Sequence, residues 1–65
     1  MRIFVNGEQR DVAPEVLALA LDELGFGGRK IATAVNGQFV AAARRATTKL
    51  SDGDRIEVVA PMQGG

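Results

Sequence analysis

Apolar and polar residues alternate at the start of the chain, which is typical of a β-strand with one buried face. Ile3 and Val5 lie on one face of this strand, and Phe4 lies on the other. The Asn6-Gly7 pair that follows tolerates the positive φ angles of a type I′ hairpin turn. We therefore expect a first β-hairpin over residues 2–12.

The next segment has the apolar spacing of an amphipathic helix. Residues at positions i, i+3, i+4 and i+7 form one apolar stripe, namely Leu17, Ala20, Leu21 and Leu24. Pro14 suits the first helical position, and Gly25 can adopt the left-handed conformation that ends a helix. Phe26 would then pack back toward Leu21. The pattern predicts a helix over residues 14–24.

A second Asn-Gly pair indicates a second hairpin. A short β-prone run over residues 31–35 meets Asn36-Gly37, and an apolar segment continues over residues 38–40. Residues 41–50 show no readable pattern. This hairpin is the last element predicted before the C-terminal strand.

The C-terminal part of the chain combines a tight turn with a strand. Gly53 is the expected left-handed residue of a turn over residues 51–54. Ile56, Val58 and Ala60 alternate on one face of a strand over residues 55–60, and Pro61 ends it because proline has no N–H to donate. This strand is the clearest partner for the first one.

These elements predict an α+β fold, in which one main helix covers one face of a mixed sheet of four to five strands. If the first and last strands lie side by side at the centre, they must run parallel, with their hairpin partners outside. This is the β-grasp (ubiquitin-like) roll. We expect one domain over residues 1–60 and a flexible tail over residues 61–65.

Composition excludes most catalytic chemistry. The 65 residues include no Cys and no His, and eight basic residues balance eight acidic ones. Thiol nucleophiles, imidazole bases and most soft metal ligands are therefore missing, and we expect no catalytic residue and no metal site. Zero net charge argues against nucleic acid as a partner, and no apolar run is long enough for a membrane span. We expect a cytoplasmic protein that is monomeric when free.

Three local clusters are better explained as ordinary structure. The glycine-rich loop over residues 25–30 lacks the helix and the hydroxyl residue of a phosphate-binding loop. Asp52 and Asp54 flank Gly53, but the further oxygen ligands that calcium needs are missing. Arg44, Arg45 and Lys49 are expected to form a solvated surface.

The last residues of the chain are the strongest functional candidate. Gly64-Gly65 follows the predicted last strand after three residues, Pro61, Met62 and Gln63. Residues without a Cβ can pass a narrow channel and present an α-carboxylate to another protein's active site. We also expect a partner surface at Phe4 and Val59, because both are out of phase with the inward-facing residues of their strands.

Taken together, these segments resemble the ubiquitin-like sulfur carriers, and most closely the ThiS family of thiamine (thiazole) biosynthesis. The resemblance covers the whole chain and rests on four segments with the sequences MRIFVNG, AVNGQFV, LSDGDRIE and the final GG. It implies that Gly65 carries the chemistry and that Gly64, Gln63 and Met62 are recognised by the partner enzymes.

The resemblance also implies partners. An E1-like adenylyltransferase would use ATP and magnesium to convert the Gly65 carboxylate into an acyl-adenylate, and this chain itself would bind no cofactor. A persulfide made by a cysteine desulfurase would then supply sulfur for a thiocarboxylate, which thiazole synthase would receive. The chain would be a protein co-substrate rather than an enzyme.

Three alternatives remain open from the sequence. The small subunit of molybdopterin synthase shares this fold and the thiocarboxylate. A ubiquitin-like protein modifier would use the same activation but form an isopeptide bond with a lysine. A non-catalytic β-grasp interaction module would carry the diglycine without using it.

Overall fold

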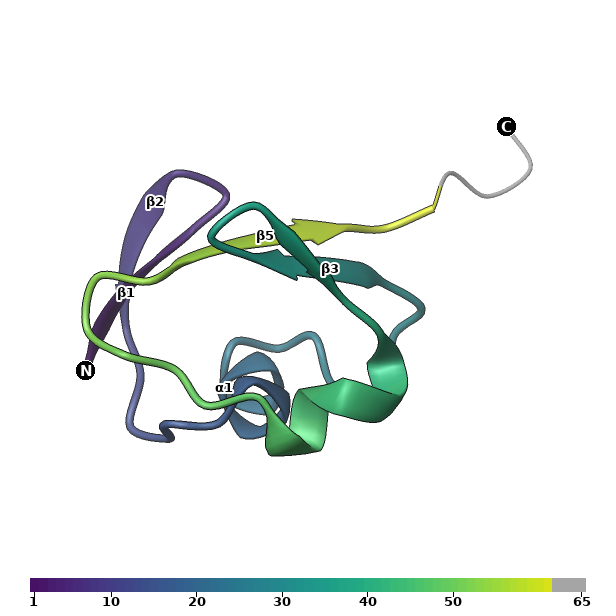
Figure 1. The fold of residues 1–65 in the computed structure, drawn as a ribbon, viewed down its shortest axis with the longest axis horizontal. Coiled ribbons are helices and arrows are strands. Elements are labelled where there is room, and N and C mark those ends of the chain that lie inside the picture. Colours follow the sequence, from purple (N-terminus) through teal and green to yellow (C-terminus); the bar gives the residue numbers. More distant parts are fainter. Residues whose placement is uncertain (62–65) are drawn as a thin grey trace.

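A computed structural model of the protein describes residues 1–61. It contains a mixed sheet, one α-helix and one 3₁₀ helix (Figure 1). The strands are β1 (Arg2–Val5), β2 (Glu8–Asp11), β3 (Ala32–Val35), β4 (Gln38–Val40) and β5 (Arg55–Val59). The helices are α1 (Leu17–Glu23) and the 3₁₀ helix η1 (Ala42–Thr47).

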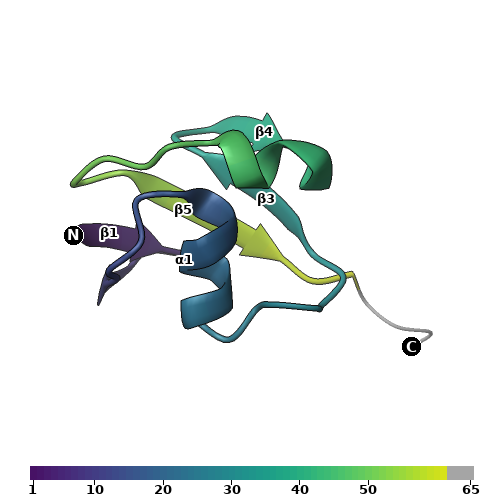
Figure 2. The ribbon, with the colours of Figure 1, turned by 90° about the horizontal axis from the view of Figure 1, so that it is seen from below.

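The strand order is β2-β1-β5-β3-β4, which confirms the predicted β-grasp arrangement. The first and last strands are adjacent and parallel, with Phe4 opposite Arg55 and Val5 opposite Ile56. β5 pairs on its other side with β3, antiparallel. Figures 1 and 2 show α1 and η1 on one side of the sheet, and within residues 1–61 no helix covers the other side. β5 therefore lies at the centre of the sheet, and residues 60 and 61 follow directly from it.

Both Asn-Gly pairs form the predicted turns. The φ angles are 51° and 84° at Asn6 and Gly7, and 50° and 84° at Asn36 and Gly37. All four lie in the left-handed region that a type I′ turn requires. The two-residue turns fix the register of both hairpins, so that Val5 lies opposite Glu8 and Val35 opposite Gln38.

The helix is shorter than the predicted range of residues 14–24. The predicted start is wrong, because residues 14–16 are not helical. Residues 15–17 pair with the chain before β5: Val16 bridges Lys49, the Leu17 N–H donates to the Thr48 carbonyl at 2.8 Å, and the Leu50 N–H donates to the Glu15 carbonyl at 2.7 Å. Val16 precedes the helix with β-region angles and no side-chain cap. Long-range backbone pairing thus overrides the local preference of Pro14 to begin a helix.

The end of the helix agrees with the prediction. Gly25 has a φ of 93°. The Phe26 N–H donates to the Leu21 carbonyl at 2.8 Å and the Gly25 N–H to the Asp22 carbonyl at 3.1 Å, which is a Schellman motif. Phe26 is half-buried and packs against the core.

The core lies between α1 and the sheet. Its apolar members are Ile3, Val5, Val12, Leu17, Ala20, Leu21, Leu50, Ile56 and Val58. The predicted helix stripe is confirmed, although its last member, Leu24, is only half-buried. Ala60 was expected to face inward, but it lies beyond the end of β5 and is exposed. Within residues 1–61, no helix has the length and apolar character needed to cross a membrane.

Residues 41–50, which had no readable pattern, contain the helix η1. One residue of this helix, Arg45, forms hydrogen bonds to the segment that contains β3. Arg45 was expected to be solvated, but it is half-buried. Its Nε donates to Thr33 Oγ1 at 3.0 Å, and a terminal guanidinium nitrogen donates to the Ile31 carbonyl at 2.7 Å. Thr33 is only 2% exposed and in turn donates to the Val40 carbonyl at 2.8 Å. The guanidinium therefore joins η1 to β3.

We predict that Arg45→Ala lowers the free energy of unfolding by about 1–3 kcal/mol, because it removes two hydrogen bonds from a charged donor and leaves a buried hydroxyl with one partner fewer. The matched control is Arg44→Ala, the neighbouring arginine, whose side chain is exposed and which should change stability by less than about 0.5 kcal/mol. Urea denaturation of both variants measures this. Equal stabilities would show that the Arg45 bonds do not hold η1 in place.

Candidate functional site

The predicted modification site and its recognition residues lie outside the described residues. These are Gly65, Gly64, Gln63 and Met62. The described chain reaches Pro61, which is exposed like Ala60 before it. The structure therefore locates the start of the predicted tail, at the end of the central strand β5.

The sheet face opposite α1 is the second predicted site. Strand alternation places Ile3, Val5, Ile56 and Val58 in the core, and Val59 on the opposite face, where it is 63% exposed. Phe4 was expected to be exposed beside Val59, and this is wrong on two points. Phe4 is half-buried, and its neighbour on β5 is Arg55.

Strand geometry explains both differences. Phe4 lies between Gln9 of β2 and Arg55 of β5, so its ring has a strand on either side. Val59 is four residues further along β5, about 13 Å away at the usual rise per residue. Phe4 and Val59 therefore belong to different parts of the same face.

Phe39 is a further exposed apolar residue on this face, and the sequence patterns did not single it out. It lies on β4 opposite Ala34, and it is 73% exposed. Ala34 is opposite Glu57, and Ala32 is opposite Val59. Because directly opposed residues point to the same side of a sheet, these side chains share the face that carries Val59. We call Phe39, Ala34, Ala32 and Val59 the β3–β5 apolar surface.

A signal for Phe39 was present in the sequence. A two-residue Asn36-Gly37 turn places Val35 opposite Gln38 and Ala34 opposite Phe39, and the alternation then puts Val40 on the inward side. Val40 does pack against the core. The register that this turn sets therefore directs Phe39 outward.

Phe4 belongs to a separate hollow on this face. The hollow has a volume of about 740 Å³ and is lined mainly by Phe4, Asn6, Gly7, Gly37, Arg55 and Glu57. The two hairpin turns border it, and β5 contributes one basic and one acidic side chain. An aromatic ring and two glycines with two opposite charges make it a mainly apolar recess with charged groups in its lining.

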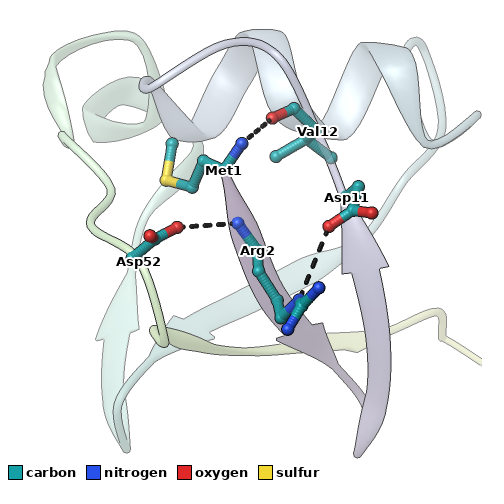
Figure 3. Close-up of polar contacts among 5 residues, drawn as sticks. All are labelled: Met1, Arg2, Asp11, Val12 and Asp52. Atoms are coloured by element: carbon teal, nitrogen blue, oxygen red, sulfur yellow. Dashed lines mark hydrogen bonds and ion pairs between the residues drawn. The ribbon is translucent and has the colours of Figure 1, made fainter.

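The turn before β5 is structural, as predicted. Asp52 Oδ1 accepts the Arg2 N–H at 2.7 Å, and Figure 3 shows this bond beside the Met1 nitrogen, which donates to the Val12 carbonyl at 2.9 Å. Asp54 Oδ2 accepts the Ser51 N–H at 2.8 Å, and Gly53 has a φ of 86°. The two carboxylates thus bind backbone amides. In the part of the chain up to residue 61, no group of three or more His, Cys, Asp or Glu residues could hold a metal ion.

Comparisons with known proteins agree with this geometry. The model of the ThiS family matches residues 3–65. The sulfur carrier protein ThiS of Thermus thermophilus is 35% identical over 63 residues, which cover 97% of this chain and 98% of that protein. A thiazole synthase of Paramagnetospirillum magneticum is 36% identical over 66 residues, and this chain spans only 20% of its length.

Solved structures show the same fold. The crystal structure of the thiamine biosynthesis protein ThiS from Geobacter metallireducens superposes with a TM-score of 0.83 at 26% identity, and the match covers both chains fully. A solution structure of a thiamine biosynthesis protein from the same organism gives a TM-score of 0.77 at 25% identity, covering 100% of this chain and 88% of that one.

Proposed function

This chain belongs to the ThiS family, the sulfur carrier proteins of thiamine biosynthesis, and we propose that it carries sulfur as a thiocarboxylate on Gly65. The observation that carries the proposal is the family match over residues 3–65, which includes the diglycine. The fold supports it, because the central strand β5 leads toward these residues.

The proposed chemistry needs no catalytic side chain from this protein. A carboxylate oxygen of Gly65 attacks the α-phosphorus of ATP, pyrophosphate leaves, and the resonance-stabilised carboxylate becomes an acyl-adenylate with a good leaving group. The terminal sulfur of a persulfide then displaces AMP. A thiol then attacks the donor's sulfur in the remaining S–S bond, forms a disulfide with it and releases the thiocarboxylate as the leaving group. This protein is a co-substrate in each step, and its full sequence contains neither Cys nor His.

Three partners follow from this sequence of steps. An E1-like adenylyltransferase would bind ATP and magnesium and activate Gly65. A cysteine desulfurase would supply the persulfide, and thiazole synthase would accept the sulfur. The similarity of this chain to a segment of a thiazole synthase supports the last partner. The reported relatives favour this reading over the small subunit of molybdopterin synthase.

The open sheet face is the surface on which we propose that a partner docks. The β3–β5 apolar surface includes Val59, the last residue of β5, and so lies next to the start of the tail. A partner that covers Phe39 and Val59 would therefore also be in position to receive residues 62–65. The recess around Phe4 offers this partner a second point of contact.

The first test of the function is chemical. Incubation with an E1-like adenylyltransferase, ATP, magnesium and a persulfide donor should replace one Gly65 carboxylate oxygen by sulfur, which intact-mass spectrometry detects. An established carrier serves as the positive control. An unchanged mass for this chain, while the control is converted, would contradict the proposal.

A second prediction concerns Gly64. If an activating enzyme receives the diglycine in a narrow channel, the branched side chain of Gly64→Val must clash there. We expect unchanged thermal unfolding but an almost complete loss of ATP–pyrophosphate exchange. A variant that exchanges as well as the unmodified chain would show that no channel reads this glycine.

A third prediction tests the docking face. Phe39→Ser should weaken binding to the adenylyltransferase or to thiazole synthase by about 1–2 kcal/mol, the usual cost of losing a modest hot spot. Phe39 is a cleaner probe than Phe4, because Phe4 is half-buried and its replacement would also cost stability.

The matched control is Leu19→Ser. Leu19 is an apolar residue on α1 with 54% exposure, and it lies on the helix side of the molecule. Isothermal titration calorimetry should find that Leu19→Ser binds the partner enzyme with the same affinity as the unmodified chain. Equal affinities for both variants would remove the β3–β5 apolar surface from the interface.

A further inference from the structure

A side-chain amide from the first hairpin turn holds the last part of β5. The backbone contact of β1 with β5 reaches Asn6, whose N–H donates to the Ile56 carbonyl at 2.9 Å. Two residues further along β5, at Val58, the hydrogen bonds come from the Asn6 side chain instead of its backbone. Its Oδ1 accepts the Val58 N–H at 2.8 Å, and its Nδ2 donates to the Val58 carbonyl at 3.1 Å. The amide thus bonds Val58 as a further strand residue would.

On its other side, β5 pairs with β3 as far as Val59, which lies opposite Ala32. The exposed residues Ala60 and Pro61 follow. Among residues 1–61, no side chain bonds to the chain beyond Val58. The Asn6 amide is therefore the side-chain anchor of β5 that lies nearest to the tail.

We propose that Asn6 is a positioning residue for the reaction at Gly65, because its amide fixes the direction in which the chain leaves the sheet. This inference rests on the proposed function. A strand end that is held on both sides restricts where the following residues can go, so fewer conformations are lost when a partner binds them. Without the amide, fewer bound complexes would place the Gly65 carboxylate in line with the α-phosphorus of ATP.

The second hairpin supplies a matched control at the opposite end of β5. Asn36 has a φ of 50°, against 51° for Asn6, in the same type of turn. Its Oδ1 accepts the Arg55 N–H at 2.9 Å, and its Nδ2 donates to Asp54 Oδ1 at 3.0 Å. Glycine tolerates the positive φ at both positions. Asn6→Gly and Asn36→Gly each remove two hydrogen bonds of an amide, and they differ in the end of β5 that they release.

The first measurement uses the free full-length chain and no partner. In ¹⁵N relaxation and amide hydrogen exchange, Asn6→Gly should increase motion and exchange at Val59 and Ala60. Asn36→Gly should do so at Arg55 and leave Val59 and Ala60 unchanged. If Val59 and Ala60 are unaffected in Asn6→Gly, the amide does not fix the strand end and the inference is wrong.

The second measurement is ATP–pyrophosphate exchange with an E1-like adenylyltransferase. Asn6→Gly should lower kcat about tenfold and change KM less than about twofold, because the β3–β5 apolar surface keeps Phe39 and Val59 while the carboxylate is misplaced. Asn36→Gly should stay within about twofold of the unmodified chain in both. Asn6→Asp keeps the acceptor for the Val58 N–H and loses the donor. Its kcat should therefore lie between those of Asn6→Gly and the unmodified chain.

The outcomes separate this inference from the proposed function. If the unmodified chain supports ATP–pyrophosphate exchange and the two glycine variants change its kcat equally, the positioning role alone is refuted. If an established carrier is adenylated while the unmodified chain is not, the proposed function fails and the positioning role with it. A loss confined to KM would assign Asn6 to docking and likewise overturn its positioning role.

Discussion

The parallel pairing of β1 with β5 is the contact on which the rest of the structure depends. It joins strands about fifty residues apart, with Val5 opposite Ile56, and so closes the longest loop of any strand pairing within residues 1–61. Both strands direct apolar side chains to the same side, where Ile3 and Ile56 are almost completely buried. Without this pairing, the stripe of α1 would have no apolar surface to cover. The central position of β5, and so the place where the tail begins, follows from the same contact.

The parts of the fold that the sequence predicted depend on local geometry or on alternation. An Asn-Gly pair prescribes a two-residue turn, the turn sets the hairpin register, and Gly25 ends the helix whatever lies around it. Alternation in β1 and β5 identified two apolar faces, and one helix could cover only one sheet. The parallel centre was then the arrangement that buried both faces, as observed.

The features that the sequence did not predict depend on contacts between distant segments. The helix begins at Leu17 because residues 15–16 pair with residues 48–50, and no local pattern announces that pairing. Arg45 enters the interior because Thr33 and the Ile31 carbonyl need a donor there. In the sequence it is one of two adjacent arginines, and only the fold distinguishes them. Phe39 differs, since its orientation followed from a register that the turn already determined.

The division of the sheet into two faces would allow one strand to serve both stability and the proposed docking of a partner. In β5, Ile56 and Val58 belong to the core, while Val59 lies on the open face, so a substitution on one side leaves the other side in place. From Val59 to Gly65 is six residues, which span at most about 20 Å when extended. A partner docked on Phe39 and Val59 must therefore have its reactive centre within this distance. In the proposed reaction this chain contributes only a carboxylate, so its fold would act by setting where that carboxylate can be delivered, and the proposed role of Asn6 is to hold the end of β5 from which the tail starts.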